Sequence, residues 1–387
     1  MVVPVAVQSL AAVAGGALVI AAWANVIGTL VVPRRGSGLT RWTERIVDRA
    51  FWAFIVAVRA SRDYRSREQL LRPQGATVLI VQFLAWLGSS FIGFTLLLWP
   101  FVTGGITQAF IVAGGSMTTL GFSEPTGTVP PAIVYVAAAS GLVIIAPQIA
   151  YLPALYEAYS RRETEVTLLS ARAGVPAWGP ELLARTHYAL SPGEGKLGIE
   201  SLPDLYAQWE RWAADVADTH SAYLPLVRFR SSGNLTSWVT ALLAVLDSAA
   251  LFLALSPASA PVVPARLFLR TGSLCFHRIA RAMGFYVDDD SDPSRDPAAI
   301  SLSDPDAGTS LTYQEFLDAV DRLRAVDFPI ERDPAEAWMT FVGWRRNYEQ
   351  AAYALAFAVD AVPAPWSGPR RRSLPAISPI RPPVGQA

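Results

Sequence analysis

Charged side chains are missing from long stretches in the first half of this 387-residue chain, although the whole sequence balances 32 basic against 32 acidic residues. Residues 1 to 33, 73 to 123 and 125 to 156 contain no Asp, Glu, Lys or Arg. A helix of about 20 apolar residues crosses the roughly 30 Å hydrocarbon core of a bilayer. Each run is long enough for this, so the sequence predicts three membrane-embedded stretches.

Cysteine, lysine and histidine are also scarce, and each scarcity excludes a kind of site. Cys275 is the sole cysteine, which rules out an intramolecular disulfide and a cysteine-based metal cluster. The histidines, His187, His220 and His277, have no paired ligand spacing, and no Gly-x-Ser-x-Gly nucleophile motif occurs. Lys196 is the single lysine, and acidic residues balance the arginines, so no nucleic-acid surface is indicated. We expect no enzyme activity, no cofactor and no resident metal.

The arginines predict the direction in which the chain crosses the membrane. Ten arginines and four acidic residues lie between Arg34 and Arg72, whereas residues 101 to 130 carry one charge, that of Glu124. Short loops rich in arginine face the cytoplasm. The arginine-rich segment is therefore predicted to be cytoplasmic, which places the N-terminus outside.

Two further observations complete this topology. Arg161 and Arg162 follow the third uncharged run and mark a second cytoplasmic boundary, so the C-terminus is predicted to be inside. Residues 1 to 33 lack the basic segment that precedes the apolar part of a secretory signal, and we interpret them as an uncleaved span. The sequence thus predicts a multi-pass protein of the cell membrane.

The cytoplasmic linker, residues 34 to 72, contains a helical pattern of its own. Between Arg41 and Arg59 the longest uncharged run is residues 50 to 58, or about 14 Å of helix, which is too short to cross a bilayer. Interleaved arginine and aromatic residues predict an amphipathic helix at the inner interface, with arginine toward anionic headgroups. A helix packed on the cytoplasmic domain is the alternative.

Between the spans predicted at 76–100 and 131–156 lies an almost uncharged interval rich in Gly and Thr. Residues 105 to 117 can form a helix of about 20 Å, which reaches part of the way through the bilayer. Residues 118 to 123, if extended at about 3.3 Å per residue, return over a similar distance. Non-helical backbone is tolerated at that depth where it is buried in protein or lines a wet cavity, so a re-entrant loop predicts a pore or vestibule.

The sequence Thr118-Thr119-Leu120-Gly121-Phe122-Ser123-Glu124 resembles the selectivity filter Thr-Thr-Val-Gly-Tyr-Gly-Asp of the two-transmembrane pore-loop potassium channels. The resemblance covers residues 76 to 160 and implies a channel whose filter carbonyls replace the hydration shell of a permeant potassium ion. One chain supplies a quarter of such a ring, so the resemblance implies a homotetramer. Gly121 is expected at positive φ. The implied ion-filter residues are Thr118, Thr119, Leu120, Gly121, Phe122 and Ser123, with the Thr119 hydroxyl as the innermost ligand.

The sequence departs from the family pattern at several positions. Ser123 replaces the second filter glycine, and a left-handed φ at such a residue costs about 1–2 kcal/mol. Glu124 replaces Asp, and Ile111 and Val112 occupy positions that often carry aromatic residues. A non-conducting membrane scaffold or sensor that retains the pore-loop fold is therefore the alternative. A membrane-tethered enzyme or ligand-binding domain is a third, weaker class.

The return span contains residues that can bend a helix. Gly141, Pro147 and Pro153 are candidates for a gating hinge, because proline removes a backbone hydrogen bond and kinks a helix. Glycine and proline are also common in membrane helices for packing reasons, which is the alternative.

The remainder, residues 161 to 362, is predicted to be an all-α cytoplasmic domain. Helical periodicity indicates helices at 203–221, 237–255, 265–286, 312–326 and 334–360. The helix at 237–255 is apolar enough to span a membrane, but Asp247 interrupts it and arginines flank it, which favours a buried core helix. Seven prolines and an arginine cluster from residue 363 onward predict a disordered tail that contacts anionic headgroups.

Two motifs in this half have competing interpretations. Residues 193 to 198 spell a dinucleotide fingerprint, but no apolar strand precedes them, and a loop is expected instead. Residues 304 to 315 have the length of a calcium loop, but Gly308 and Thr309 occupy its central positions. Thr312 and Glu315 are predicted to form a capping box that opens a helix.

Overall fold

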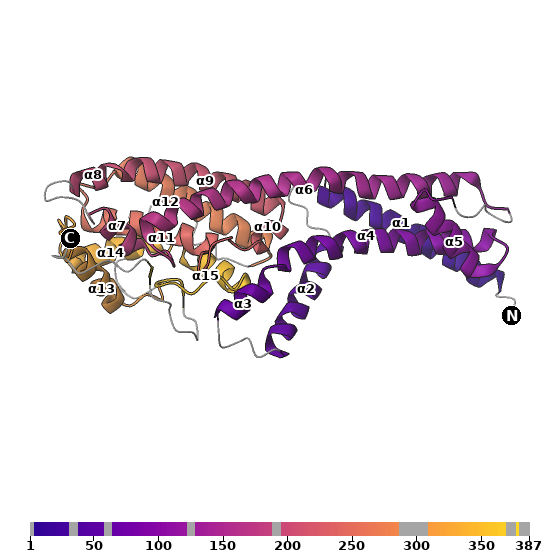
Figure 1. Ribbon diagram of the computed structural model, residues 1–387, viewed down its shortest axis with the longest axis horizontal. Coiled ribbons are helices and arrows are strands. Elements are labelled where there is room, and N and C mark those ends of the chain that lie inside the picture. Colours follow the sequence, from indigo (N-terminus) through magenta and orange to yellow (C-terminus); the bar gives the residue numbers. More distant parts are fainter. Residues whose placement is uncertain are drawn as a thin grey trace. The chain divides into compact units, whose positions relative to one another are not determined.

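All elements named in the described part of the chain are helices (Figure 1). The computed structural model describes residues 4–30, 38–57, 64–121, 128–187, 195–285, 309–368 and 377–378. Contacts divide the chain into two compact units. Unit 1 comprises Met1–Val58 and Pro73–Glu157, and unit 2 comprises Arg59–Arg72 and Ala158–Ala387. The predicted all-α fold is confirmed at this level.

Four helices in the described part of the chain are long and apolar enough to cross a membrane, and three of them begin in the uncharged runs. They are α1 (Val5–Leu30), α4 (Gln74–Leu98), α6 (Pro131–Ala173) and α11 (Trp238–Leu255). Their most apolar windows have mean hydropathies of 1.8 to 2.1. α1, α4 and α6 contribute such windows to unit 1, so this unit has the composition of a membrane-spanning bundle.

The two helices α1 and α4 pack closely along each other in unit 1 (Figure 1). A Cβ added to Gly15 would lie 2.5 Å from the carbonyl oxygen of Gly93, and one added to Gly93 would lie 2.8 Å from a methyl group of Val19. Small residues let membrane helices approach in this way. The contact fixes α1 against α4.

The helix α2 (Gly38–Ala57) belongs to unit 1. It buries Val47 and Ile55, and the Gln74 side-chain amide donates to Asp48 Oδ1 at 2.9 Å. Its other face exposes aromatic and basic side chains: Trp42, Arg45, Arg49, Trp52 and Phe54. The predicted amphipathic helix is therefore present. The predicted linker, residues 34 to 72, is divided between the two units, because α3 (Tyr64–Leu71) belongs to unit 2.

Unit 2 is built around α11, in which every residue is buried. Asp247, in the middle of this helix, forms an ion pair with Arg345 and accepts a hydrogen bond from the Tyr348 hydroxyl at 2.8 Å. A buried charge needs such partners. The helix therefore occupies the core of unit 2, as the flanking arginines and Asp247 predict.

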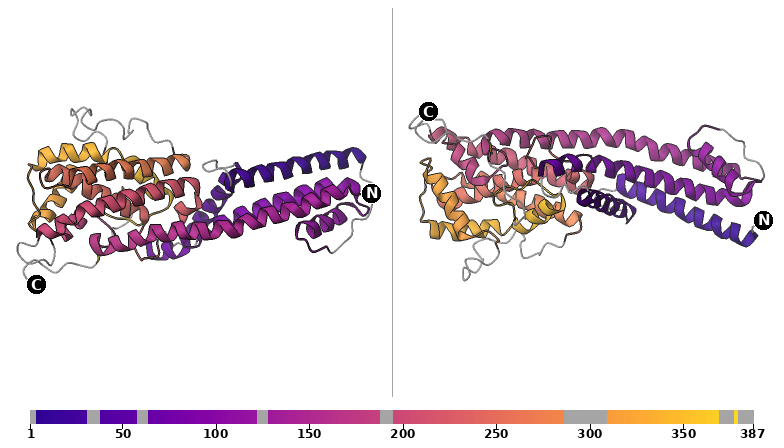
Figure 2. Two further views of the ribbon diagram at one scale, coloured as in Figure 1. Left: turned by 90° about the horizontal axis from the view of Figure 1, so that it is seen from above. Right: turned by 60° about the horizontal axis from the view of Figure 1, so that its bottom comes forward.

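Further helices surround α11, and Figure 2 shows α9 and α12 side by side. The rings of Tyr206 and Phe268 stack between these two, with centroids 6.0 Å apart. The other helices of unit 2 are α7 (Gly179–Arg185), α8 (Gly195–Glu200), α9 (Leu202–Ala222), α10 (Pro225–Arg228), α12 (Val262–Ala282), α13 (Tyr313–Arg324), α14 (Pro334–Arg345) and α15 (Glu349–Ala358).

Two local features of unit 2 bear on sequence predictions. The capping box at the start of α13 is confirmed: Thr312 accepts from the Glu315 amide, and Glu315 accepts from the Thr312 amide at 2.8 Å. Residues 195–200 form α8 where a loop was expected; Gly198 lies so close to the Thr186 carbonyl that a Cβ would be 1.8 Å from its oxygen. Residues 188–194 and 286–308 lie outside the described residues.

The expected tail and the expected long helix at 334–360 both differ from the structure. Trp366 is 7% exposed and packs on Trp178 and Phe341, so the chain is folded as far as residue 368. The long helix is two helices, α14 and α15. The interruption at 346–348 directs the Asn347 carbonyl toward α12, where it accepts from Ser273 at 2.6 Å.

Candidate functional site

The interval between α4 and α6 contains a short helix, α5 (Gly105–Met117), with the predicted bounds. A 3-10 turn at Trp99–Phe101 ends the α4 segment, and Gly104 and Gly105 then adopt φ values of +115° and +74°. Glycine takes such angles without a steric penalty. The chain reverses at this point into a helix of 13 residues, or about 20 Å.

The helix α5 packs against α4 through its apolar side. Ala109, Val112 and Met117 are buried in one cluster with Phe94 and Leu98. The rings of Phe91 and Phe110 meet edge to face, with centroids 4.6 Å apart. The helix α5 is thus held against α4 within unit 1, and with 13 residues it is too short to cross a bilayer.

The residues that resemble a filter begin with amides that bond back to the last turn of α5. The Leu120 and Gly121 amides donate to the Gly115 carbonyl at 3.0 and 3.3 Å, and Thr119 has a φ of +56°. This is the Schellman arrangement, in which a left-handed residue lets the following amides bond back to the helix. The extended path expected from residue 118 is therefore wrong at Thr118 and Thr119, which continue and cap the helix.

Gly121 has a φ of +62°, the left-handed value expected from its place in the motif. Residues 118 to 121 are exposed in the single chain. The Thr119 hydroxyl donates to the Thr118 carbonyl at 2.7 Å, which leaves its oxygen lone pairs available to a cation. Phe122, Ser123 and Glu124 lie outside the described residues.

Gly141 of α6 lies in close contact with Met117 at the end of α5. A Cβ on Gly141 would lie 1.9 Å from the Met117 carbonyl oxygen, so this oxygen occupies the space of a side chain. One residue earlier, the Ser140 hydroxyl accepts from the Trp23 indole at 3.0 Å. Gly141 is thus a close-contact position between α6 and the end of α5.

The candidate hinge residues do not interrupt the helix. α6 is continuous from Pro131 to Ala173 and includes Gly141, Pro147 and Pro153. The close contact at Gly141 matches the packing alternative. No hinge is visible at these three positions in the part of α6 that the structure describes.

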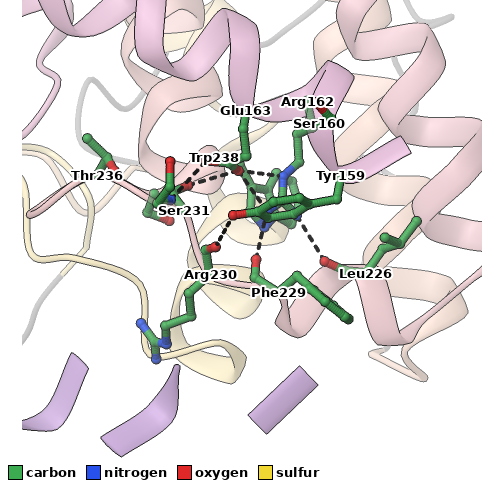
Figure 3. A network of polar contacts seen from close by, with 12 residues as sticks. Tyr159, Ser160, Arg162, Glu163, Leu226, Phe229, Arg230, Ser231, Thr236 and Trp238 are labelled. Carbon is green, nitrogen blue, oxygen red and sulfur yellow. Dashed lines mark hydrogen bonds and ion pairs between the residues drawn. The ribbon is translucent and has the colours of Figure 1, made fainter. Parts of the chain in front are cut away.

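Beyond residue 157, α6 belongs to unit 2 and carries a buried arginine, Arg162, whose burial the charge pattern does not predict. The Arg162 side chain has no exposed surface, and it pairs with Glu163 at 2.7 Å. It donates to the carbonyl oxygens of Leu226 at 2.9 Å and Phe229 at 2.7 Å (Figure 3). Its guanidinium also lies 5.2 Å from the centroid of the Tyr159 ring.

A sequence signal for this burial exists. Arg162 lies four residues from Ala158 and from Val166, both buried apolar positions, and so shares their helix face. Arg161 points elsewhere and is 48% exposed. Helical periodicity distinguishes the two arginines, whereas the charge pattern alone does not.

The Arg162 network also fixes the protonation state of a histidine. Arginine has no acceptor, so His220 Nε2, 3.1 Å from Arg162 Nη1, must accept the hydrogen bond in its neutral form. Burial lowers the pKa of His220 well below its ordinary value of 6.5, and the Arg162 charge lowers it further. His220 is therefore neutral in the folded protein at neutral pH.

The native protein is expected to lose stability relative to a His220→Gln variant as the pH falls below 6.5. The unfolded chain then binds a proton at His220 that the folded chain excludes, so the difference in unfolding free energy changes by up to about 1.4 kcal/mol per pH unit. Glutamine keeps an oxygen that accepts from Arg162. Denaturant titrations of both proteins in detergent, from about pH 7.5 to 5.5, measure the difference. A difference independent of pH would contradict the assignment.

The end of α5 offers oxygen atoms, from hydroxyl groups and backbone carbonyls, which are the ligands that alkali and alkaline-earth cations prefer. Comparison of the chain with family models, with curated proteins and with solved structures finds no match.

Proposed function

We propose that the chain is one subunit of a homotetrameric cation channel that conducts potassium. The observation that carries this proposal is the half-length helix α5, which ends in the exposed sequence Thr118-Thr119-Leu120-Gly121 between two long apolar helices. A segment that enters a membrane as a helix of about 20 Å and returns to the same side needs a protein or aqueous lining for its non-helical part. Four copies around one axis provide that lining.

The exposure of residues 118–121 in a single chain agrees with such an assembly. Carbonyl oxygens that coordinate a permeant ion must face a common axis and not the protein interior. With the N-terminus outside, as the arginine distribution predicts, the pore loop enters from the outer surface and the Thr119 hydroxyl is the innermost ligand.

The exposed face of α2 fits the inner surface of the bilayer. Trp42 and Trp52 are 59% and 64% exposed, and Arg45 and Arg49 are exposed beside them. Aromatic rings partition to the interface, and arginine pairs with anionic headgroups. We therefore include anionic lipid among the partners of the protein.

One observation favours the alternative of a non-conducting membrane scaffold or sensor. The Leu120 and Gly121 amides bond to Gly115, so the described start of the filter sequence folds over the end of α5. A stack of carbonyl ligands requires these residues to leave the helix. Binding of an ion in the tetramer would have to favour that rearrangement.

Two glycine substitutions, one in the proposed filter and one outside it as a control, test the channel proposal. Gly121→Ala introduces a side chain at positive φ where four chains converge, and we expect it to abolish potassium flux. Gly105→Ala introduces the same strain at a φ of +74°, with no atom within 4 Å of the added Cβ, and we expect flux to remain. Flux assays in liposomes, with the tetramer verified by size-exclusion chromatography, provide the comparison.

The outcome separates the two functions. Equal flux for the Gly121→Ala variant and the native protein would overturn the filter assignment. No flux from the native protein, but flux from a Ser123→Gly variant, would favour the scaffold, because that change restores the glycine of the family pattern.

A further inference from the structure

One segment of unit 2, residues 226–232, contacts both segments that lead into the predicted pore spans. It comprises the end of α10 and the loop that follows it, and we name it the bridging loop. On one side it contacts α6. The Tyr159 hydroxyl donates to the Arg230 carbonyl at 3.1 Å, and the Ser231 hydroxyl donates to Glu163 Oε1 at 3.1 Å. Together with the two carbonyls that accept from Arg162, these bonds fasten the loop to the continuation of the return span (Figure 3).

On the other side the bridging loop contacts α3, which ends at Leu71, shortly before α4 begins at Gln74. Arg230 Nη1 donates to Glu68 Oε2 at 2.6 Å, and the two side chains are 8% and 11% exposed. Water and salt screen such a shielded ion pair less than a surface pair. Removal of one partner would leave a shielded charge without compensation, which costs more than the loss of an exposed pair.

The same arginine closes the network at the end of α15. Arg230 Nη1 and Nη2 donate to the carbonyl oxygens of Asp360 at 3.1 Å and Val359 at 2.8 Å. The Asp360 carboxylate in turn pairs with Arg67 of α3. Arg230 thus joins α3 to the C-terminal part of unit 2, while the neighbouring Ser231 joins the loop to α6.

We propose that the bridging loop is the regulatory element that couples unit 2 to the pore. A rearrangement of unit 2 that displaces this loop acts at the same time on α6 and on α3, which continue into the spans on either side of the pore loop. Coupling between distant sites requires an element whose arrangement depends on both sites. The bridging loop meets this requirement, because Arg230 bonds to α3 and the adjacent Ser231 bonds to α6. The effect on conduction rests on the proposed channel function.

Glu68→Gln tests the coupling from the α3 side. Glu68 bonds to Tyr64 and Arg230, neither of which lies on α6. In the full-length protein in detergent, we expect amide hydrogen exchange to become about fivefold faster in α6 residues 158–170 as well as in α3, since a weakened loop opens more often. In bilayers, the same variant should change the channel open probability about fivefold.

Asp218→Asn is the matched control, because it removes one partner of the Arg278 ion pair, whose side chains are 67% and 39% exposed. It should change neither exchange in α6 nor open probability. An Arg230→Gln variant also loses the bonds to the Val359 and Asp360 carbonyls, so it should speed exchange in α6 at least as much as Glu68→Gln does. Adding Glu68→Gln to it should change little more, because the Glu68–Arg230 pair is already broken.

The two measurements separate coupling from conduction. Faster exchange confined to α3 and residues 359–360 would overturn the coupling, whether or not the protein conducts. Faster exchange in α6 with an unchanged open probability would overturn the regulatory role. Absence of flux from the native protein would contradict the channel function instead, and exchange would still decide whether the loop links α3 to α6.

Discussion

A Gly141→Ala variant is expected to lose ion conduction. The added Cβ would lie 1.9 Å from the Met117 carbonyl oxygen and 2.9 Å from its carbonyl carbon, so either α6 or the end of α5 must move. Both atoms belong to backbone, which cannot rotate away as a flexible side chain can. Overpacking of this kind costs about 1–3 kcal/mol at each site, and the proposed tetramer would contain four such sites. We expect potassium flux to fall by about tenfold or more.

Gly88→Ala provides the control for this experiment. Gly88 lies on α4, and an added Cβ there has no atom of the chain within 4 Å. Liposome flux of the two variants, normalised to the amount of tetramer, separates a local effect at Met117 from a general effect of alanine in a membrane helix. Full flux through Gly141→Ala would contradict a role in conduction for the close contact between α6 and the end of α5.

Arg162→Met is expected to destabilise unit 2 by about 3–5 kcal/mol, the usual result of breaking a buried ion pair from one side. The substitution removes the partner of Glu163, whose side chain is 9% exposed, and leaves the Leu226 and Phe229 carbonyls without their donor. Methionine retains much of the aliphatic volume, so the loss reflects charge and hydrogen bonding more than packing. Thermal and denaturant unfolding of the full-length protein in detergent measure it.

The adjacent arginine is the matched control. Arg161 pairs with Asp215 at 3.3 Å, and the two side chains are 48% and 37% exposed. Exposed pairs contribute about 0–1 kcal/mol, so Arg161→Met should change stability little. Equal effects of the two substitutions would show that Arg162 does not hold α6 in unit 2.

The sequence alone could predict elements whose signals are local. The bounds of α5 follow from the Gly104-Gly105 pair before it and from the polar residues after Met117. The core position of α11 follows from Asp247, because a lone carboxylate in an apolar helix is tolerated where protein supplies a partner. That partner, Arg345, lies 98 residues further along the chain and could not be identified from the sequence.

Features that depend on distant partners could not be predicted. The pattern from 334 to 360 has no glycine or proline at the interruption between α14 and α15, which is stabilised by bonds from Ser273 and His277 to the Asn347 carbonyl. Proline content predicted a tail from residue 363, but the Trp366 ring packs in a hydrophobic cluster and its carbonyl accepts from Arg345. In each case tertiary contacts override a local preference.

Potassium flux through the purified native protein in liposomes tests the central claim most directly. Vesicles loaded with potassium and diluted into sodium are expected to generate an inside-negative potential that carries protons inward in the presence of a protonophore, and the reversal potential in planar bilayers should follow the potassium gradient. No flux above empty vesicles from protein that is tetrameric and folded would contradict the account of the α5 loop as an ion-conducting pore.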